Sequence, residues 1–253
     1  MAFVHSLQTS RFELKYVIDE ACAAGIRNFV RSYLDPDEYA DVRHQNSYVV
    51  SSLYLDNAVL YLFDQTVAGK KNRFKLRIRF YDDNRHNPAF LEIKRRIGGV
   101  IFKERAKVTR DGVCQVLAGK GPKRTYLMSA TGDSEGESAL QNFCNLCFSI
   151  DAHGCIYVTY RREAYVSPES NQIRLTFDRE LLGSPYEAGT GLVMPTHGVR
   201  PATGNDGRVI LELKFTDRFP DWMRDLVHTF NLQRMSVPKY VHCIRKLEMR
   251  PDG

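Results

Sequence analysis

The sequence predicts an α+β fold: an eight-stranded antiparallel β-barrel that forms a tunnel with a basic lumen and is flanked by helices. Three observations predict it. Apolar and polar residues alternate in eight short segments, basic residues concentrate on the polar side of the alternation, and stretches with helical apolar spacing separate several of the segments. A barrel built from all eight segments would use the whole chain, so we expect one domain over residues 1–253.

The segment RFKLRIRFY, residues 73–81, shows the alternation most clearly. Arg73, Lys75, Arg77 and Arg79 would point one way, and apolar side chains the other. Same-face neighbours on a strand lie roughly 7 Å apart, so each like-charge pair costs about 2 kcal/mol at an effective dielectric constant near 20. In open water salt would screen this repulsion, whereas in a confined space the row needs an anionic partner. For a single strand of this kind, an ordinary solvated face is the favoured interpretation, and the rest of the chain has to decide.

Seven further segments show the same alternation: residues 11–18, 47–56, 90–96, 101–108, 156–163, 172–178 and 208–215. Eight charged faces could coat one side of a sheet, or they could line the lumen of a closed or nearly closed barrel whose apolar faces lie outward beneath helices. The chain supplies candidate helices at residues 19–34, 57–66, 111–118, 137–149, 220–231 and 237–248, with Asp19 as an N-cap. We favour the barrel, with every helix outside it.

The face assigned to the lumen is strongly basic. Its expected cations are Lys15, Lys75, Arg77, Arg79, Lys94, Lys103, Arg105, Lys107, Arg161, Arg174 and Lys214. Four acids oppose them, namely Glu13, Glu92, Asp178 and Glu212. Arginine can bind phosphate oxygens bidentately and lysine adds point charges, while a few carboxylates suit a divalent metal that bridges phosphates. The lumen is therefore typical of a site for a linear, densely charged anion.

Composition and motifs exclude several functional classes for this protein. The formal net charge of +6 favours an anionic partner, and no apolar run approaches the roughly 20 residues of a membrane-spanning helix. No signal peptide is visible, and six cysteines in a chain of this size suit a reducing compartment, so we expect a cytoplasmic protein. Cys144 and Cys147 form a CxxC, but their helical context indicates core residues rather than metal ligands. P-loop, Rossmann and HExxH motifs are absent.

A set of short segments follows along the chain in this order: RFELKYVI, SSLYLD, KLRIRFY, FLEIKRR, KER, YRR, RLTFD, LELKF and PKY. The ordered set resembles a vacuolar transporter chaperone (VTC) domain. That family comprises polyphosphate polymerase domains of the triphosphate tunnel metalloenzyme superfamily, which also contains the CYTH phosphatases. The resemblance runs from about residue 10 to residue 248, and it implies an eight-stranded tunnel that binds ATP and polyphosphate.

The resemblance also implies roles for individual residues. Phosphate contacts with a catalytic role are expected from Lys15, Arg77, Arg79, Lys94, Arg161, Arg174 and Lys239. Further substrate contacts are expected from Lys75, Lys103, Arg105, Lys107 and Lys214. Glu212 is the implied ligand of Mn²⁺ or Mg²⁺, with Glu13 and Glu92 as further candidates.

Two departures from the resemblance bear on the reaction. CYTH phosphatases open with ExExK, whereas here only Glu13-Leu14-Lys15 is present, which argues against a plain triphosphatase. The polymerase pattern often carries a second lysine shortly after the lysine of PKY, and this chain has His242 three residues beyond Lys239. This difference bears on the efficiency of polymerisation rather than on phosphate binding.

The leading interpretation is a metal-dependent phosphotransferase that moves the terminal phosphoryl group of ATP to a polyphosphate chain. The alternatives are a triphosphate or polyphosphate hydrolase and a non-catalytic polyphosphate or inositol-phosphate-binding module. A nucleic-acid binder is disfavoured, because its phosphate contacts would normally lie on an open surface with exposed aromatic residues. Polymerases of this type often work beside membrane segments, so a membrane partner protein is an open expectation. The Gly- and Pro-rich segment 183–206 is interpreted as a flexible connection rather than a lid at the tunnel mouth.

Overall fold

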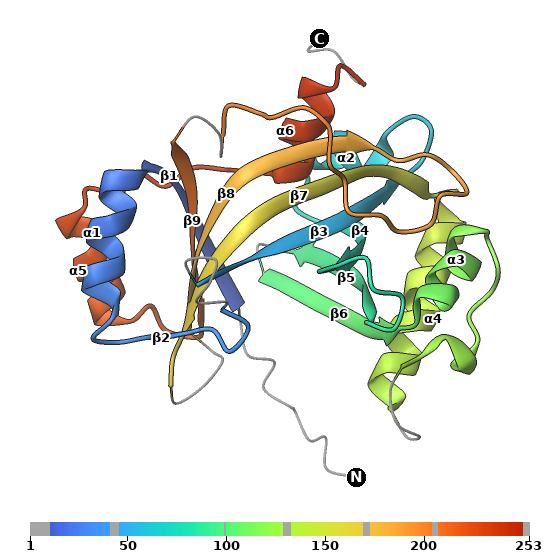
Figure 1. Cartoon of the computed structure of the whole chain (residues 1–253), viewed down its shortest axis with the longest axis horizontal. Coiled ribbons are helices and arrows are strands. Elements are labelled where there is room, and N and C mark those ends of the chain that lie inside the picture. Colours follow the sequence, from blue (N-terminus) through green and yellow to red (C-terminus); the bar gives the residue numbers. More distant parts are fainter. Residues whose placement is uncertain are drawn as a thin grey trace.

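The computed structural model describes residues 11–40, 46–98, 100–128, 133–168, 173–203 and 207–249. Its centre is one curled antiparallel sheet (Figure 1). Eight strands cross it in this order: β1 (Arg11–Asp19), β9 (Arg208–Thr216), β8 (Arg174–Pro185), β7 (His153–Val166), β3 (Ser47–Asp56), β4 (Arg73–Phe80), β5 (Ala89–Ile97) and β6 (Val100–Val108). A short strand, β2 (Asp35–Pro36), pairs with the end of β7. The α+β class and the eight predicted strands are confirmed; residues 1–10, Gly99 and the first residue of the segment 172–178 lie outside the described residues.

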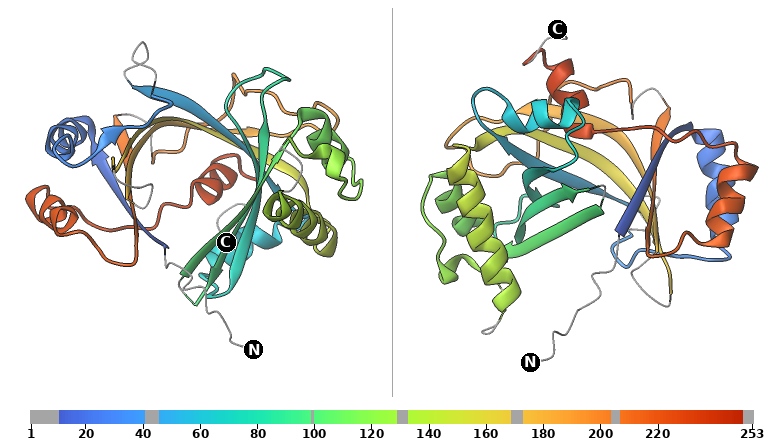
Figure 2. Two further views of the ribbon diagram at one scale, coloured as in Figure 1. Left: turned by 90° about the horizontal axis from the view of Figure 1, so that it is seen from below. Right: turned by 180° about the vertical axis from the view of Figure 1, so that it is seen from behind.

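The sheet curls into a half-barrel whose outer strands are β1 and β6. Seen from below, the strands arch around helix α6 (Lys239–Lys246) (Figure 2). A side-chain contact bridges the opening near the outer strands, because Lys94 Nζ on β5 lies 2.9 Å from Glu13 Oε2 on β1. The predicted barrel is thus a half-barrel that side chains help to close.

The helices of the described chain match the predicted stretches. They are α1 (Glu20–Val30), α2 (Tyr61–Val67), α3 (Arg110–Leu117), α4 (Ser134–Ser149), α5 (Asp221–Thr229) and α6 (Lys239–Lys246). The Asp19 side chain accepts a hydrogen bond of 2.7 Å from Cys22 N, so it caps α1 as expected. Cys144 and Cys147 lie partly buried on α4 as free thiols packed against the core. Burial raises the pKa of Cys147 to about 12, as expected of a core residue rather than a reactive thiol.

Two apolar clusters lie on the convex face of the sheet. Under α3 and α4, fully buried residues such as Leu76 and Ile93 pack with Phe143. Under α1 and α5, Leu211 packs with Ile26. These clusters take up the apolar side of the alternation, which leaves the charged side facing the concave interior.

Helix α6 is an exception to the prediction that every helix lies outside the barrel. Figure 2 shows it inside the curl of the sheet, where Tyr240 and Ile244 pack against Val158 and Ile210. The concave face therefore has an apolar part, covered by α6, and a charged part. Sequence periodicity missed this because an apolar side chain reads the same whichever face of the sheet a helix covers.

The segment after β8 runs over the outside of the barrel. Leu192 and Met194 pack against the cluster beneath α3 and α4, and Tyr157 Oη donates a hydrogen bond of 2.8 Å to Gly191 O. Within 186–203 no residue lines the tunnel cavity, which favours the connection over the lid; residues 204–206 lie outside the described residues. In the part of the chain that the structure describes, no helix has the length and apolarity needed to cross a membrane.

Candidate functional site: a cationic tunnel

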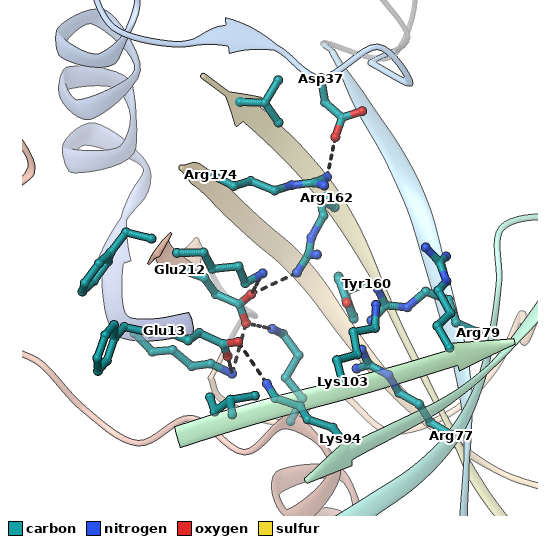
Figure 3. A pocket seen from close by; sticks show the side chains of 18 of the residues that line it. Glu13, Asp37, Arg77, Arg79, Lys94, Lys103, Tyr160, Arg162, Arg174 and Glu212 are labelled. Atoms are coloured by element: carbon teal, nitrogen blue, oxygen red, sulfur yellow. Dashed lines mark hydrogen bonds and ion pairs between the residues drawn. The ribbon is translucent and has the colours of Figure 1, made fainter. Parts of the chain in front are cut away.

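A cavity of about 860 Å³ occupies the charged part of the concave face (Figure 3). Among the described residues, eleven cationic side chains line it: Lys15, Lys75, Arg77, Arg79, Lys94, Lys103, Arg105, Arg162, Arg174, Lys214 and Lys239. The lining carboxylates are those of Glu13, Asp37, Glu38 and Glu212. The cavity thus brings together most of the residues that the sequence analysis assigned to the lumen, and it carries an excess of positive charge.

Arg161 is the clearest correction. Its Nε lies 3.5 Å from Glu180 Oε2, outside the cavity, and the adjacent Arg162 lines the cavity instead. The alternation in 156–163 was assigned to the wrong faces, because Ile156, Val158 and Tyr160 look like residues packed beneath an outer helix. They lie on the concave face, where α6 covers the first two and Tyr160 reaches the cavity.

Lys107 and Glu92 also differ from expectation. Lys107 is exposed near the end of β6 and is not among the lining residues. Glu92 is fully buried behind the lining cations, and it does not line the cavity either. Its position suits a carboxylate that balances charge and disfavours a direct metal ligand.

The face formed by β4, β5 and β6, which we name the cationic wall, is organised around Glu92. Glu92 Oε2 lies 2.7 Å from Arg77 Nη2, and Glu92 Oε1 lies 2.6 Å from Lys103 Nζ and 3.4 Å from Arg105 Nε. Burial alone would raise the pKa of Glu92, but Arg79, Arg77 and Lys103 hold it well below its usual range. One carboxylate therefore serves several cations.

Two members of the cationic wall have capacity left for an anion. Arg79 Nε is buried and makes no hydrogen bond, and its ion pair with Glu92 Oε2 is long, at 3.8 Å. Within the described part of the chain, Lys75 has no carboxylate at ion-pair distance, and it stands directly across from Lys94. Burial, together with Lys94 and Lys15, lowers the pKa of Lys75 to about 7. Since a buried unpaired donor is costly, Arg79 Nε points to an acceptor that arrives with the ligand, and the like-charge pair of Lys75 and Lys94 would be relieved by the same anion.

The opposite face, which we name the paired wall, comprises β7, β8, β9, β1 and the first residue of α6. Glu212 on β9 is its hub. Glu212 Oε1 lies 3.1 Å from Lys15 Nζ and 2.7 Å from Lys239 Nζ. Glu212 Oε2 lies 2.7 Å from Lys214 Nζ and 3.2 Å from Arg162 Nη2. Burial would raise the pKa of Glu212, but these four cations keep it well below its ordinary value.

Asp178 is a second counter-ion for the cations of the paired wall. Arg162 donates two hydrogen bonds of 2.7 Å to the Asp178 carboxylate, and Lys239 Nζ lies 2.6 Å from Asp178 Oδ2. Near the mouth at β2, Arg174 pairs with Asp37 and donates a hydrogen bond of 2.9 Å to Tyr48 Oη. Each of these cations therefore has a carboxylate partner before any ligand binds.

A divalent metal fits this wall only with help from a ligand. No group of three or more His, Cys, Asp or Glu residues gathers at a common point in the described ranges, so those residues form no complete metal cage. Mg²⁺, however, is commonly held by one or two carboxylates together with phosphate oxygens and water. Glu13 and Glu212 match that pattern, because Lys15 Nζ already lies between them, 3.0 Å from Glu13 Oε1 and 3.1 Å from Glu212 Oε1. A cation is thus favoured between these two carboxylates.

A family model described as the VTC domain matches residues 10–248. The chain belongs to this family. A search of curated proteins gave no match. Among solved structures, a putative adenylate cyclase from Bacillus halodurans is similar, with 12% identity, a TM-score of 0.49, and coverage of 90% of this chain and 93% of that chain.

This VTC domain also uses residues that sequence reasoning missed. Besides Arg162 and Asp37, two tyrosines line the cavity, Tyr54 on β3 and Tyr160 on β7. Tyr54 Oη accepts a hydrogen bond of 3.3 Å from Arg77 Nη1, and the Tyr54 ring stacks on Tyr240 of α6 at 4.9 Å between centroids. Period-two alternation could have identified Tyr54, since it lies on the same strand face as Ser52 and Tyr48; nothing in the sequence signalled its partner on α6.

Proposed function

We propose that this VTC domain is a metal-dependent polyphosphate polymerase that binds ATP and polyphosphate in the tunnel. It would transfer the terminal phosphoryl group of ATP to the end of a polyphosphate chain. The bond between the γ-phosphorus and the bridging oxygen breaks, a terminal oxygen of the polyphosphate bonds to that phosphorus, and ADP leaves with the bridging oxygen. The observation that carries the proposal is the cationic wall, where, among the described residues, Arg79 Nε makes no hydrogen bond and Lys75 has no carboxylate at ion-pair distance.

The residues of the two walls would act mainly by binding and orienting phosphates. Phosphoryl transfer asks for little covalent chemistry from a protein, so positioning and neutralisation of charge can provide most of the rate enhancement. Arg77, Arg79 and Lys75 would hold a phosphate chain on the cationic wall. Arg162 and Lys239 are fixed by Asp178 and would present donors of defined direction. When bound, Mn²⁺ or Mg²⁺ held by Glu212 and Glu13 would neutralise charge on the phosphate oxygens.

The acceptor decides between this function and its nearest alternative. With water as acceptor the same tunnel would be a triphosphate or polyphosphate hydrolase, and with no acceptor it would be a binding module for polyphosphate or inositol phosphates. The chain lacks the first acid of ExExK, and a phenylalanine, Phe12, separates Arg11 from Glu13. This departure supports transfer over hydrolysis. The same proposal includes a cytoplasmic location and a membrane partner protein that receives the product.

The test is incubation of the purified protein with ATP and Mn²⁺ or Mg²⁺, followed by separation of polyphosphate from free phosphate. We expect polyphosphate chains and ADP in metal-dependent amounts. Free phosphate alone would replace the polymerase by the hydrolase. Neither product, combined with tight binding of polyphosphate, would leave the binding module. A protein that neither turns over ATP nor binds polyphosphate would refute the proposal.

A further inference from the structure

A second basic hollow lies outside the tunnel. It has a volume of about 250 Å³ and lies where the start of β4 and the end of β5 meet α2. Arg73, Arg95 and Arg96 line it together with the side-chain amides of Gln65 and Asn72. Three arginines around so small a space suggest an anionic occupant, provided that they are not already neutralised.

Only one of the three arginines has a carboxylate partner in the part of the chain that the structure describes. Arg95 Nε lies 2.8 Å from Glu104 Oε1 on the convex face. Arg73 donates to the backbone oxygen of Lys70, and no carboxylate of the described residues lies within ion-pair distance of Arg73 or Arg96. These two arginines stand directly opposite each other on β4 and β5. Like charges placed directly across a sheet are destabilising, so the pair is costly until an anion lies between them.

The strand register places Arg73 and Arg96 directly beyond the cations that line the tunnel. Lys75 and Lys94, the next cross-strand pair, both line the cavity. Arg96 pairs on its other side with Ile101, which also lines it. Two residues along a strand correspond to roughly 7 Å, so an anion held by Lys75 and Lys94 lies one short step from Arg73 and Arg96. The exposed lysines at positions 70 and 71 extend the positive charge outward.

We propose that Arg73 and Arg96 form an external subsite for the part of a polyphosphate chain that extends beyond the tunnel, so that the protein holds long chains more tightly than short ones. The inference rests on the proposed function, because it assumes that polyphosphate occupies the tunnel. The occupant is a linear phosphate polymer, since it must be continuous with the ligand held by Lys75 and Lys94. Tripolyphosphate, with three phosphates, would be held mainly by the cations of the tunnel, whereas a long chain would also extend across the subsite.

The test compares affinities for tripolyphosphate and long-chain polyphosphate at low salt, measured by calorimetry. In the variant Arg73→Gln/Arg96→Gln we expect about a five- to tenfold loss of affinity for the long chain, the scale of two partly exposed ion contacts. Affinity for tripolyphosphate should change less than twofold. Thermal stability without ligand should hold or rise, because one repelling pair is gone.

The matched control is Arg31→Gln/Arg224→Gln, which removes the same charge from exposed positions beside α1 and on α5. This control should retain the wild-type preference for long chains, which separates a local contact from a change in net charge. Wild-type preference in the Arg73→Gln/Arg96→Gln variant, an equal loss in the control, or a wild type that binds both ligands equally would overturn the subsite alone. A wild type that binds neither ligand would refute the proposed function, and the subsite with it.

Discussion

The two walls of the tunnel are built from the same residue types but balance their charges in opposite ways. On the paired wall, Glu212 and Asp178 sit among the cations and engage Lys15, Arg162 and Lys239 directly. On the cationic wall, Glu92 serves Arg77, Lys103 and Arg105 together, while Lys94 reaches Glu13 across the opening of the sheet. The comparison teaches that lysine and arginine content does not locate an anion site; the distribution of carboxylates does.

The pKa shifts of Lys15 and Lys103 agree with this division, although burial also lowers the pKa of Lys214, on the paired wall, to about 8. On the paired wall the carboxylates around Lys15 raise its pKa, outweighing the effect of burial. On the cationic wall burial lowers the pKa of Lys103 to about 7, even though Glu92 opposes the shift. The paired wall is thus preorganised in the free protein, while the cationic wall is completed only when an anion binds.

Removal of Glu212 is the strongest test of this contrast. Glu212→Gln should abolish metal-dependent turnover, because it removes a proposed metal ligand, while tripolyphosphate still binds through the cations. The free protein should also lose on the order of 3 kcal/mol of stability, since four cations would lose their shared carboxylate. Turnover assays and thermal unfolding with and without tripolyphosphate measure both effects.

Glu180→Gln is the control for that variant, because Glu180 is an exposed carboxylate paired with Arg161 outside the cavity. It should leave turnover and ligand-free stability close to wild type. Near-normal metal-dependent activity in Glu212→Gln would show that Glu212 merely balances charge, and the division of labour between the walls would have to be abandoned.

The second test separates the cationic wall from arginines elsewhere. Arg79→Gln should weaken tripolyphosphate binding by about 1.5–3 kcal/mol, the scale of a charge-assisted hydrogen bond, because its buried Nε awaits an acceptor. Arg161→Gln should leave binding unchanged, since that side chain lies outside the cavity. Titration calorimetry of the two variants decides the matter; equal losses would mean that net charge, rather than the wall, governs binding.

The third and smallest effect concerns pH. Lys75 has a pKa of about 7 in the folded protein against an ordinary value of 10.5. Between pH 7 and pH 10 the unfolded chain therefore binds more protons, so the stability of the ligand-free protein should rise with pH across this window. An anion favours the charged lysine, so affinity for tripolyphosphate should fall about three- to tenfold from pH 7 to pH 8.5.

Calorimetry at pH 8 in buffers of different ionisation enthalpy would reveal the proton uptake that accompanies binding. The protonation of the free ligand is the same in every titration, so the difference in proton uptake between the wild type and a variant reports on the protein. Lys75→Gln is the informative variant and should take up fewer protons. Binding without proton exchange would contradict a cationic wall that is incompletely charged in the free state.

The sequence predicts most of the scaffold and much of the candidate site, for a physical reason. A strand such as RFKLRIRFY records its two faces in alternate residues, so Arg77 and Arg79 could be assigned to the lumen without a structure. The assignment of Arg161 failed where alternation carried no information about which apolar face a helix covers. Once α6 is inside the barrel, Ile156 and Val158 become concave residues, and Arg162 takes the place expected of Arg161.

Other features depend on contacts between distant parts of the chain. Glu92 is a counter-ion because the strand register places it between Arg77 and Arg105, and Asp37 meets Arg174 because β2 pairs with β7 beside β8. The alternation gives the face on which a charge lies, but it does not give the partner. Partners across the tunnel had to come from the structure.

The pairing of β1 with β9 has a consequence for how the protein is made. Lys15 faces Glu212 across this pair, and Lys15 Nζ also donates to Val237 O at 3.4 Å. During synthesis, β1 therefore stays without its partner strand until β9, far along the sequence, has been made. Such long sequence separations slow folding and leave an unpaired strand edge exposed meanwhile. Because Lys239 begins α6, the tunnel is completed only after this helix has left the ribosome, so a product that stops before Arg208 would present a partial sheet without a finished tunnel.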